Sequence, residues 1–236
     1  MMKNIGFRII KNFIRPSLHL LAQFRHIPIS ILDDSMNRTA AISSRFFAVN
    51  DKPVLGTAYT VRVPSGDNLL FYYAIAQAKK GDVIVVDGGG FSERALCGEI
   101  MAELAKAREL AGFVVYGAIR DKRELAKMNF PVFACAATPN GPYKNGPGEI
   151  NVPVNIGGRV IYPGDIIAGD ESGVISIRPK DAETVLAAAA QIINKEQQML
   201  TEIRADKNLN LDWVYTKLTQ NGCEFIEEAV NYDNYL

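Results

Sequence analysis

The stretch DVIVVD at residues 82–87 is a short apolar run rich in β-branched side chains, a pattern typical of a strand buried on both faces. Residues 92–110 are dominated by strong helix formers, and residues 113–116 (FVVY) form a second run of the buried-strand type. A helix-length connection between two such strands favours a right-handed parallel crossover. We therefore predict that strands 82–87 and 113–116 are parallel neighbours joined by a helix over 92–110.

The rest of the chain alternates short strands and helices without an internal repeat or a clear linker, so we expect one α/β domain. The further expected elements are a helix over 29–41 with Ser30 as its N-cap, a strand over 55–63, a helix over 68–79, a strand over 132–136, a loop over 138–149, a hairpin of 151–156 with 159–162 across Gly157-Gly158, and a long helix from 179 to about 206. Three consecutive glycines, 88–90, are expected to end the strand that begins at 82.

The composition excludes several classes of protein. The 236 residues are 48% hydrophobic and 22% charged, with 26 basic and 26 acidic residues, so no global charge argues for a nucleic-acid partner. No run approaches the ~20 apolar residues of a membrane span. Cys97, Cys135 and Cys223 include no CxxC pair, which indicates reduced thiols in a cytoplasmic protein, with Cys97 as a buried small side chain.

The two ends of the chain differ from its centre. The first 28 residues carry five basic side chains and no acid, which predicts a solvated, partly ordered N-terminal helix and leaves a weak targeting or membrane-surface role open. The last 30 residues are polar and aromatic, with Trp213, Tyr215 and Phe225. We divide the chain into an N-terminal extension (1–28), a catalytic domain (29–206) and a C-terminal tail (207–236) that packs on the domain or on a neighbouring subunit.

Charged residues follow both predicted strands. Glu99 lies at the start of the segment after the first strand, and Arg120-Asp121 follows the second. Ligands of open α/β sheets bind at this carboxyl edge. A carboxylate supplies oxygen to Mg²⁺ or Mn²⁺, and arginine offers a planar fork to a substrate carboxylate. The alternative is a surface salt bridge between a helix start and a loop.

Other motifs favour structural interpretations. The glycine triplet lacks the flanking residues of a nucleotide-binding loop, and the only histidines, His19 and His26, support neither a zinc cluster nor a histidine-based triad. Lys122, between two charged residues, is expected to be a solvated charge, and imine chemistry is the alternative. Three aspartates in Gly-Asp turns are expected to satisfy local backbone groups; they are Asp82, Asp165 and Asp170.

Several of these motifs together resemble the RraA-like superfamily. The resemblance covers roughly residues 30–205 and lies in GTAYTV (56–61), GDVIVVD (81–87), the spacing from Gly98 to Arg120-Asp121, and PGDIIAGDESGV (163–174). That group contains 4-hydroxy-4-methyl-2-oxoglutarate aldolases, which also decarboxylate oxaloacetate, and protein inhibitors of ribonuclease E. The resemblance implies a single-domain α-β-β-α layered fold, assembled as a homotrimer or hexamer with sites at subunit interfaces.

The resemblance also implies roles for individual residues. Asp121 would bind the divalent metal, and Arg120 with Gly98, Glu99, Ile100 and Met101 would hold the pyruvyl half of the substrate. Glu99 stands where the family more commonly has aspartate, and we expect it to position a water for proton transfer. A further catalytic acid would come from the C-terminal helix of an adjacent subunit, with Glu196 as the best match and Glu202 as the alternative.

The predicted activity is therefore cleavage of a 4-hydroxy-2-oxo dicarboxylic acid to pyruvate and a second keto acid, with oxaloacetate decarboxylation as a related reaction. Both reactions pass through a pyruvate enolate, which Mg²⁺ or Mn²⁺ would stabilise. One alternative is a non-catalytic trimeric regulator that binds a protein partner such as a ribonuclease. A different carbon–carbon lyase or sugar-acid enzyme on the same scaffold is another.

Overall fold

The computed structural model describes residues 4–226, which fall into two compact units divided between Ile192 and Ile193. The strands are β1 (Phe7–Ile9), β2 (Phe47–Ala48), β3 (Val54–Arg62), β4 (Asp82–Cys97), β5 (Gly112–Ile119), β6 (Val132–Ala137), β7 (Gly148–Ile150), β8 (Val154–Ile156), β9 (Arg159–Ile161), β10 (Ile166–Asp170) and β11 (Gly173–Ile177). The helices are α1 (Leu18–Gln23), α2 (Ile29–Asp34), α3 (Leu69–Gln77), α4 (Glu99–Ala107), α5 (Lys122–Lys127), α6 (Ala182–Asp206, entered through a 3₁₀ turn at Pro179–Asp181) and α7 (Asp212–Gln220).

Four parallel strands form the centre of the first unit. The main sheet has the order β1-β7-β3-β4-β5-β6-β2, and β10 pairs with the edge of β3. β4 lies parallel to β5 with Val83 opposite Gly112, so the predicted strand pair is confirmed. The predicted hairpin also forms, since β8 and β9 pair antiparallel across Gly157-Gly158.

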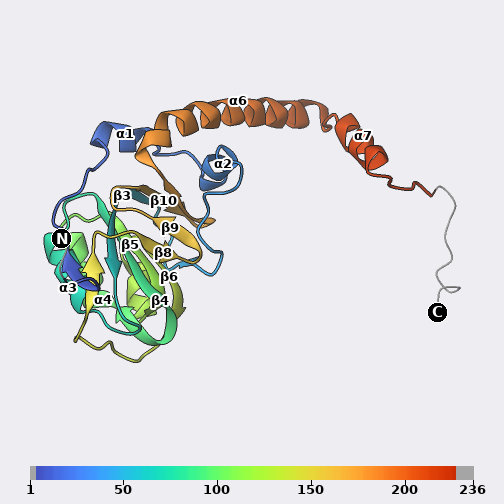
Figure 1. Cartoon of the computed structure of the whole chain (residues 1–236). Coiled ribbons are helices and arrows are strands. Elements are labelled where there is room, and N and C mark those ends of the chain that lie inside the picture. The colour runs from blue at the N-terminus through green and yellow to red at the C-terminus, as the bar shows by residue number, and fades with distance from the viewer. Residues whose placement is uncertain (1–3, 227–236) are drawn as a thin grey trace, which may run out of the picture. The chain divides into compact units, whose positions relative to one another are not determined.

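Helices cover one face of this sheet and a second β layer covers the other (Figure 1). On the helical side, the Phe113 ring lies 4.9 Å from the rings of both Phe71 and Phe130, edge-to-face in each case. On the opposite side, the apolar residues of β4 and β5 pack with those of β8, β9 and β10. Because successive side chains of a strand point to opposite faces, each central strand contributes to both cores. The layered α/β class is therefore confirmed.

The helix predicted over residues 92–110 is wrong in its first half. β4 continues through the glycine triplet to Cys97, and α4 begins only at Glu99. Gly89 and Gly90 take positive φ of 69° and 68°, which lets the strand shift register and pair again with β5 at Phe91 and beyond. Pairing with the neighbouring strand thus overrides the local helix preference of residues 92–97.

The basic N-terminal segment is a mostly exposed helix, as predicted, only over the short α1, and the residues before α1 are attached to the sheet. β1 pairs parallel with β7, with Phe7 opposite Gly148. Arg15 donates from Nε and Nη2 to the two oxygens of Asp82, both at 2.8 Å, and Asp82 is only 1% exposed. Since burying a lone carboxylate costs several kcal/mol, this bidentate pair fixes the segment to the sheet. The structural role predicted for Asp82 is confirmed.

The helix predicted over residues 29–41 is only the six-residue α2. Ser30 lies inside it and is not the N-cap. The carboxylate of Asp170 accepts a hydrogen bond from the Ile29 N–H at 3.3 Å, so a distant turn satisfies the first orphan donor of the helix. Just beyond α2, Asn37 takes a φ of 57°, a conformation that ends a right-handed helix.

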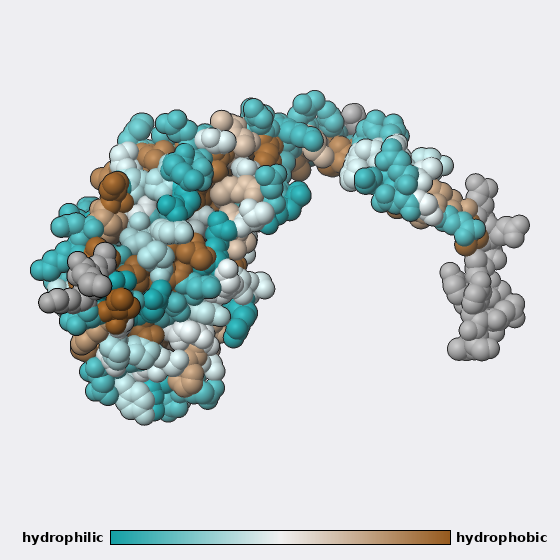
Figure 2. All heavy atoms as spheres, in the orientation of Figure 1, coloured by the Kyte–Doolittle hydropathy of each residue, from teal (hydrophilic) through white to brown (hydrophobic). Residues whose placement is uncertain are grey.

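The second unit contains the end of α6, a short connection and α7. Every side chain that the structure describes in this unit is at least partly exposed, among them Trp213 and Tyr215 at 66% and 62%. Figure 2 shows brown apolar atoms along this segment between teal polar ones. Within residues 4–226, no helix is both long and apolar enough to cross a membrane.

Candidate active site

The ends of β4 and β5 bring two charged turns together. β4 ends at Cys97, and Gly98 is the N-cap residue of α4. β5 ends at Ile119, and Arg120 and Asp121 lead into α5. The Arg120 N–H donates to the Cys97 carbonyl at 2.9 Å, which links the two turns directly. The predicted convergence of these segments at the sheet edge is therefore confirmed.

Asp121 is the centre of the polar contacts at this edge. Its Oδ2 accepts a hydrogen bond from the Glu99 N–H at 3.1 Å and lies 3.4 Å from Arg120 Nε. The carboxylate thus faces the positive end of the α4 dipole. Asp121 itself has a φ of 55° and a ψ of 38°, a left-handed conformation that costs a non-glycine residue on the order of 1 kcal/mol. Such local strain is common where a side chain must be aimed at a ligand.

Gly98 allows this close approach. A Cβ added there would overlap Asp121 Oδ2 and would lie 2.8 Å from Arg120 Cγ. The backbone of Gly98 is extended, with φ of −157°, so conformational freedom is not the reason for glycine here. Its missing side chain leaves the space that the Arg120 and Asp121 side chains occupy.

A cavity of about 140 Å³ opens beside these turns. It is lined by Asn68, Tyr72, Cys97, Gly98, Ile100, Met101, Arg120, Gly141, Pro142 and Lys144. At about 30 Å³ per water, it holds roughly five water molecules, a volume suited to a small keto acid and too small for a nucleotide. Four of the five predicted substrate-binding positions, Gly98, Ile100, Met101 and Arg120, line this cavity, whereas Glu99 and the predicted metal ligand Asp121 do not.

Two polar lining residues were absent from the sequence-based prediction. Asn68 is 2% exposed and donates to the Leu96 carbonyl at 2.9 Å, but its Oδ1 has no hydrogen-bond partner among residues 4–226. Lys144 contributes a second cation, with Nζ 5.9 Å from the centre of the Tyr72 ring. Asn68 precedes α3 and Lys144 lies in the loop before β7, so no sequence spacing connects either residue with Arg120.

Other predicted residues occupy distinct environments. Burial raises the pKa of the Cys97 thiol to about 12, and the charge of Asp121 adds to this shift, so the thiol is neutral and not a nucleophile at physiological pH. The Glu99 side chain is exposed at the first turn of α4. Glu196 and Glu202 are exposed on the part of α6 that belongs to the second unit, and their place in the site stays a prediction.

The donor set is compatible with a water-rich divalent metal site and not with a closed one. Within the described residues, no three histidine, cysteine or acidic side chains are grouped closely enough to hold a metal ion. Asp121 is 36% exposed and stands over the bare backbone of Gly98, which leaves room beside its carboxylate. Mg²⁺ commonly takes one or two carboxylates and completes its shell with water and substrate oxygens.

Comparison with known proteins identifies the family. The family model described as RraA-like, Aldolase/RraA, matches residues 29–176, which is more than half of the chain. The chain belongs to the RraA-like family. It is 42% identical over 173 residues to a protein of Halalkalibacterium halodurans named "Putative 4-hydroxy-4-methyl-2-oxoglutarate aldolase", covering 73% of this chain and 82% of that relative.

Solved structures of the family share this fold but carry different names. The RNA-processing inhibitor RraA from Thermus thermophilis is 32% identical, with a TM-score of 0.60 over 64% of this chain and 92% of that one. A structure from Geobacillus kaustophilus named as an S-adenosylmethionine:2-dimethylmenaquinone methyltransferase is 31% identical, with a TM-score of 0.60 over 64% and 94%. Because relatives of similar identity carry unlike names, the activity of this RraA-like protein has to be argued from its own site.

Proposed function

We propose that this RraA-like protein is a divalent-metal-dependent carbon–carbon lyase acting on small 2-oxo dicarboxylic acids. The observation that carries this proposal is that Arg120 and Lys144 line one small cavity, while Asp121 lies 3.4 Å from Arg120 Nε and accepts a hydrogen bond from the N–H of Glu99 at the start of α4. The aldolase name of the Halalkalibacterium relative supports the same class of reaction. The activity is cleavage of a 4-hydroxy-2-oxo dicarboxylate to pyruvate and a second keto acid, with oxaloacetate decarboxylation alongside it.

Two cations at one cavity favour a substrate with two carboxylates. Arg120 offers its guanidinium fork to the carboxylate of the pyruvyl half, and Gly98 and Ile100 at the start of α4 line the same cavity. Lys144 is suited to the carboxylate at the far end. Oδ1 of Asn68 has no hydrogen-bond partner among residues 4–226 and is an acceptor, so a substrate hydroxyl in the cavity can donate to it.

Asp121 is the residue that holds the metal in this proposal. Mg²⁺ or Mn²⁺, when bound, supplies Lewis-acid polarisation of the carboxylate and ketone oxygens of the 2-oxo acid. The Glu99 N–H and the Arg120 guanidinium keep the Asp121 carboxylate in one orientation. Arg120 also places positive charge next to the oxygen at which negative charge develops.

The bond that breaks in both reactions is C3–C4 of the substrate. In the aldol cleavage, the 4-hydroxyl loses its proton, the bonding electrons move towards the C2 oxygen, and a proton then returns to C3. Glu99, exposed at the start of α4, positions the water that takes up and returns this proton. Decarboxylation releases CO₂ and needs only the second proton transfer, so both reactions use the same substrate-binding residues. Glu196 of an adjacent copy supplies the remaining acid in this proposal.

A trimeric or hexameric assembly would complete such a site. The second unit has no buried side chain among its described residues, although Trp213 and Leu211 are among several large apolar side chains in it. Exposed apolar surface of this kind commonly marks an interface, and closed symmetry is the usual form of homo-oligomers. Light scattering tests the assembly, because a 25.9 kDa species at micromolar concentration would contradict it.

The function is tested by pyruvate release from oxaloacetate in the presence of Mg²⁺, coupled to lactate dehydrogenase. A protein-free sample with the same metal concentration corrects for spontaneous decarboxylation. We expect turnover that excess EDTA abolishes and that Asp121→Ala reduces by at least 10²-fold while the melting temperature stays within a few degrees. Full turnover in EDTA, or in the Asp121→Ala protein, would refute the metal assignment.

The second candidate function is a non-catalytic regulator that binds a ribonuclease, and the name of the Thermus relative is the observation in its favour. The two candidates make opposite predictions for the same variant. Asp121→Ala should remove turnover if the protein is a lyase, but should leave ribonuclease inhibition intact if the protein acts as a regulator. A wild-type protein without lyase activity on a panel of 4-hydroxy-2-oxo acids, but with inhibitory activity, would decide for the regulator.

A further inference from the structure

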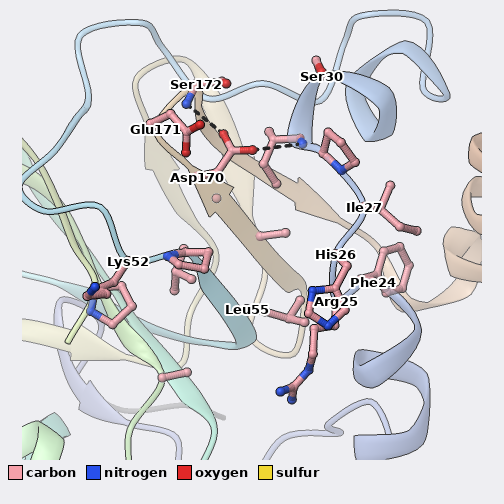
Figure 3. Close-up of a pocket in the computed structure, with 18 of the residues that line it drawn as sticks. Phe24, Arg25, His26, Ile27, Ser30, Lys52, Leu55, Asp170, Glu171 and Ser172 are labelled. Carbon is pink, nitrogen blue, oxygen red and sulfur yellow. Dashed lines mark hydrogen bonds between the residues drawn. The ribbon is translucent and has the colours of Figure 1, made fainter. Parts of the chain in front are cut away.

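A second cavity, of about 750 Å³, lies away from the candidate active site and shares no lining residue with it. It is formed by the chain between α1 and α2, the segment leading into β3, and the turn between β10 and β11 (Figure 3). Its volume is within the range of about 300–1,000 Å³ that small-molecule sites occupy. Nothing in the proposed lyase mechanism uses it.

The N-terminal segment of this chain creates one wall of the cavity. Residues 24–28 line it and precede the part of the chain that the family model matches, which starts at residue 29. Phe24 is 3% exposed and anchors this wall in the body of the unit. The opposite wall is apolar and comes from the family core, with Val54, Leu55 and Ala168. The cavity therefore combines a wall from outside the matched region with a largely apolar floor from within it.

Three cationic or titratable basic side chains surround this floor. Arg25 and His26 come from the N-terminal wall, and Lys52 comes from the segment before β3, so that Leu55 lies between them in Figure 3. Neither Arg25 nor His26 has an ion-pair partner among residues 4–226, and both are exposed. The Lys52 ammonium lies 2.9 Å from the solvent-exposed carboxylate of its neighbour Asp51.

Acidic groups lie at the other end. The carboxylate of Asp170 already has hydrogen-bond partners within the protein. It accepts from the Ser172 N–H at 2.8 Å and from the Ile29 N–H at 3.3 Å, both drawn in Figure 3. Glu171 is exposed next to it. The cavity thus has basic side chains around an apolar floor and one free acid, Glu171, at one end.

From this arrangement we propose that the cavity binds an organic anion with an apolar body, with its anionic group towards Arg25, His26 and Lys52. The apolar body lies over Leu55 and Val54. Charge-assisted contacts to the basic side chains give the preference for an anion, and burial of apolar surface gives most of the affinity. Glu171 disfavours a second negative charge at the far end. The proposal is independent of the lyase activity, because the two cavities share no residue.

The test uses two dyes with the same aromatic body. 8-Anilino-1-naphthalenesulfonate carries a sulfonate, and N-phenyl-1-naphthylamine is the same molecule without it; both increase in fluorescence in apolar surroundings. We expect the full-length protein to bind the anionic dye saturably at one site per chain. The double variant Arg25→Gln/Lys52→Gln should weaken that binding about tenfold and change the neutral dye less than twofold. Arg25 is exposed and the half-buried Lys52 has a side chain that is 39% exposed, so we expect the variant to keep its fold.

Three further variants locate the site. Leu55→Trp enlarges a half-buried side chain of the floor and should weaken both dyes more than tenfold. Glu171→Gln should not weaken the anionic dye, because it removes a like charge. Lys217→Gln on α7 removes a cation outside the cavity and should leave both dyes unaffected. Equal affinity of the wild type for the two dyes, unchanged anionic-dye binding in the double variant, or unchanged binding in Leu55→Trp would each overturn the proposal.

Discussion

Replacing Gly98 by alanine tests whether the bare backbone at this position is what permits the Arg120–Asp121 arrangement. The new Cβ would overlap Asp121 Oδ2 and come within 2.8 Å of Arg120 Cγ and 3.2 Å of Arg120 Nε. Real Cβ atoms do not approach other atoms at the two shorter separations, so one or both side chains have to move. That movement breaks the 3.1 Å hydrogen bond from the Glu99 N–H and the 3.4 Å ion pair.

The cost of this change should fall on activity and not on stability. The φ of −157° suits alanine, and the displaced side chains are 40% and 36% exposed, so they can swing into solvent. Alanine also lowers the entropy of the unfolded chain relative to glycine, which offsets part of the lost contacts. We expect a net change below ~1 kcal/mol, equivalent to a shift in melting temperature below about 4 °C for a chain of this size.

Misplacing a residue that orients metal and substrate commonly costs on the order of 10²-fold in rate. We therefore expect kcat/KM for oxaloacetate to fall by at least that factor in Gly98→Ala, measured as pyruvate release at saturating Mg²⁺. Gly141→Ala is the matched control, because its Cβ would lie 3.4 Å from Arg120 Nη1, close to ordinary contact, and should reduce kcat/KM less than about fivefold. A Gly98→Ala protein within threefold of the wild type would refute the reasoning.

Three further predictions concern the same region. Glu99→Gln should lower kcat by ~10²–10⁴-fold, which is the usual contribution of a proton-transfer group. The affinity for Mn²⁺ should fall much less than it does in Asp121→Ala. An unchanged kcat would mean that Glu99 only stabilises the start of the helix by its charge. Arg120→Lys should fail to restore activity because an ammonium lacks the planar fork, and a lysine variant within threefold of wild type would contradict that role. Iodoacetamide at pH 8 should label the exposed Cys223 of the native protein but not Cys97. Burial raises the pKa of the Cys97 thiol to about 12, so the fraction of reactive thiolate is low. Mass spectrometry of the native and the unfolded protein after labelling checks this.

The parts of the fold that the sequence predicts correctly are those with a strong local pattern. The run at residues 83–86 is continuously apolar because its strand is buried on both faces, and that pattern is recognisable without knowledge of the neighbouring strands. The turn after each strand carries its own charged residue, so strand order and the carboxyl-edge rule suffice to bring Glu99 near Asp121.

The errors arise where a distant contact outweighs the local preference. Residues 92–97 favour a helix by composition, but β5 pairs with Phe91, Ala95 and Cys97 of a strand that the glycine triplet lets bend. The basic side chains of the N-terminal segment predict a solvated helix, because the sequence does not show which acidic residue pairs with them. In the structure, Arg15 donates to the carboxylate of Asp82, which lies 67 residues further along the chain.

The sequence by itself determined the family, the central strand pair and the charged residues at its edge, because each depends on residue type and short spacing. Only the tertiary structure decided which other side chains share the cavity with Arg120. Asn68 and Lys144 reach it from a helix start and a loop, and their proximity depends on how the sheet packs and not on any spacing along the chain. The second cavity could likewise not be predicted from the sequence, since its two walls come from segments that meet only when the N-terminal segment packs against the edge of the sheet.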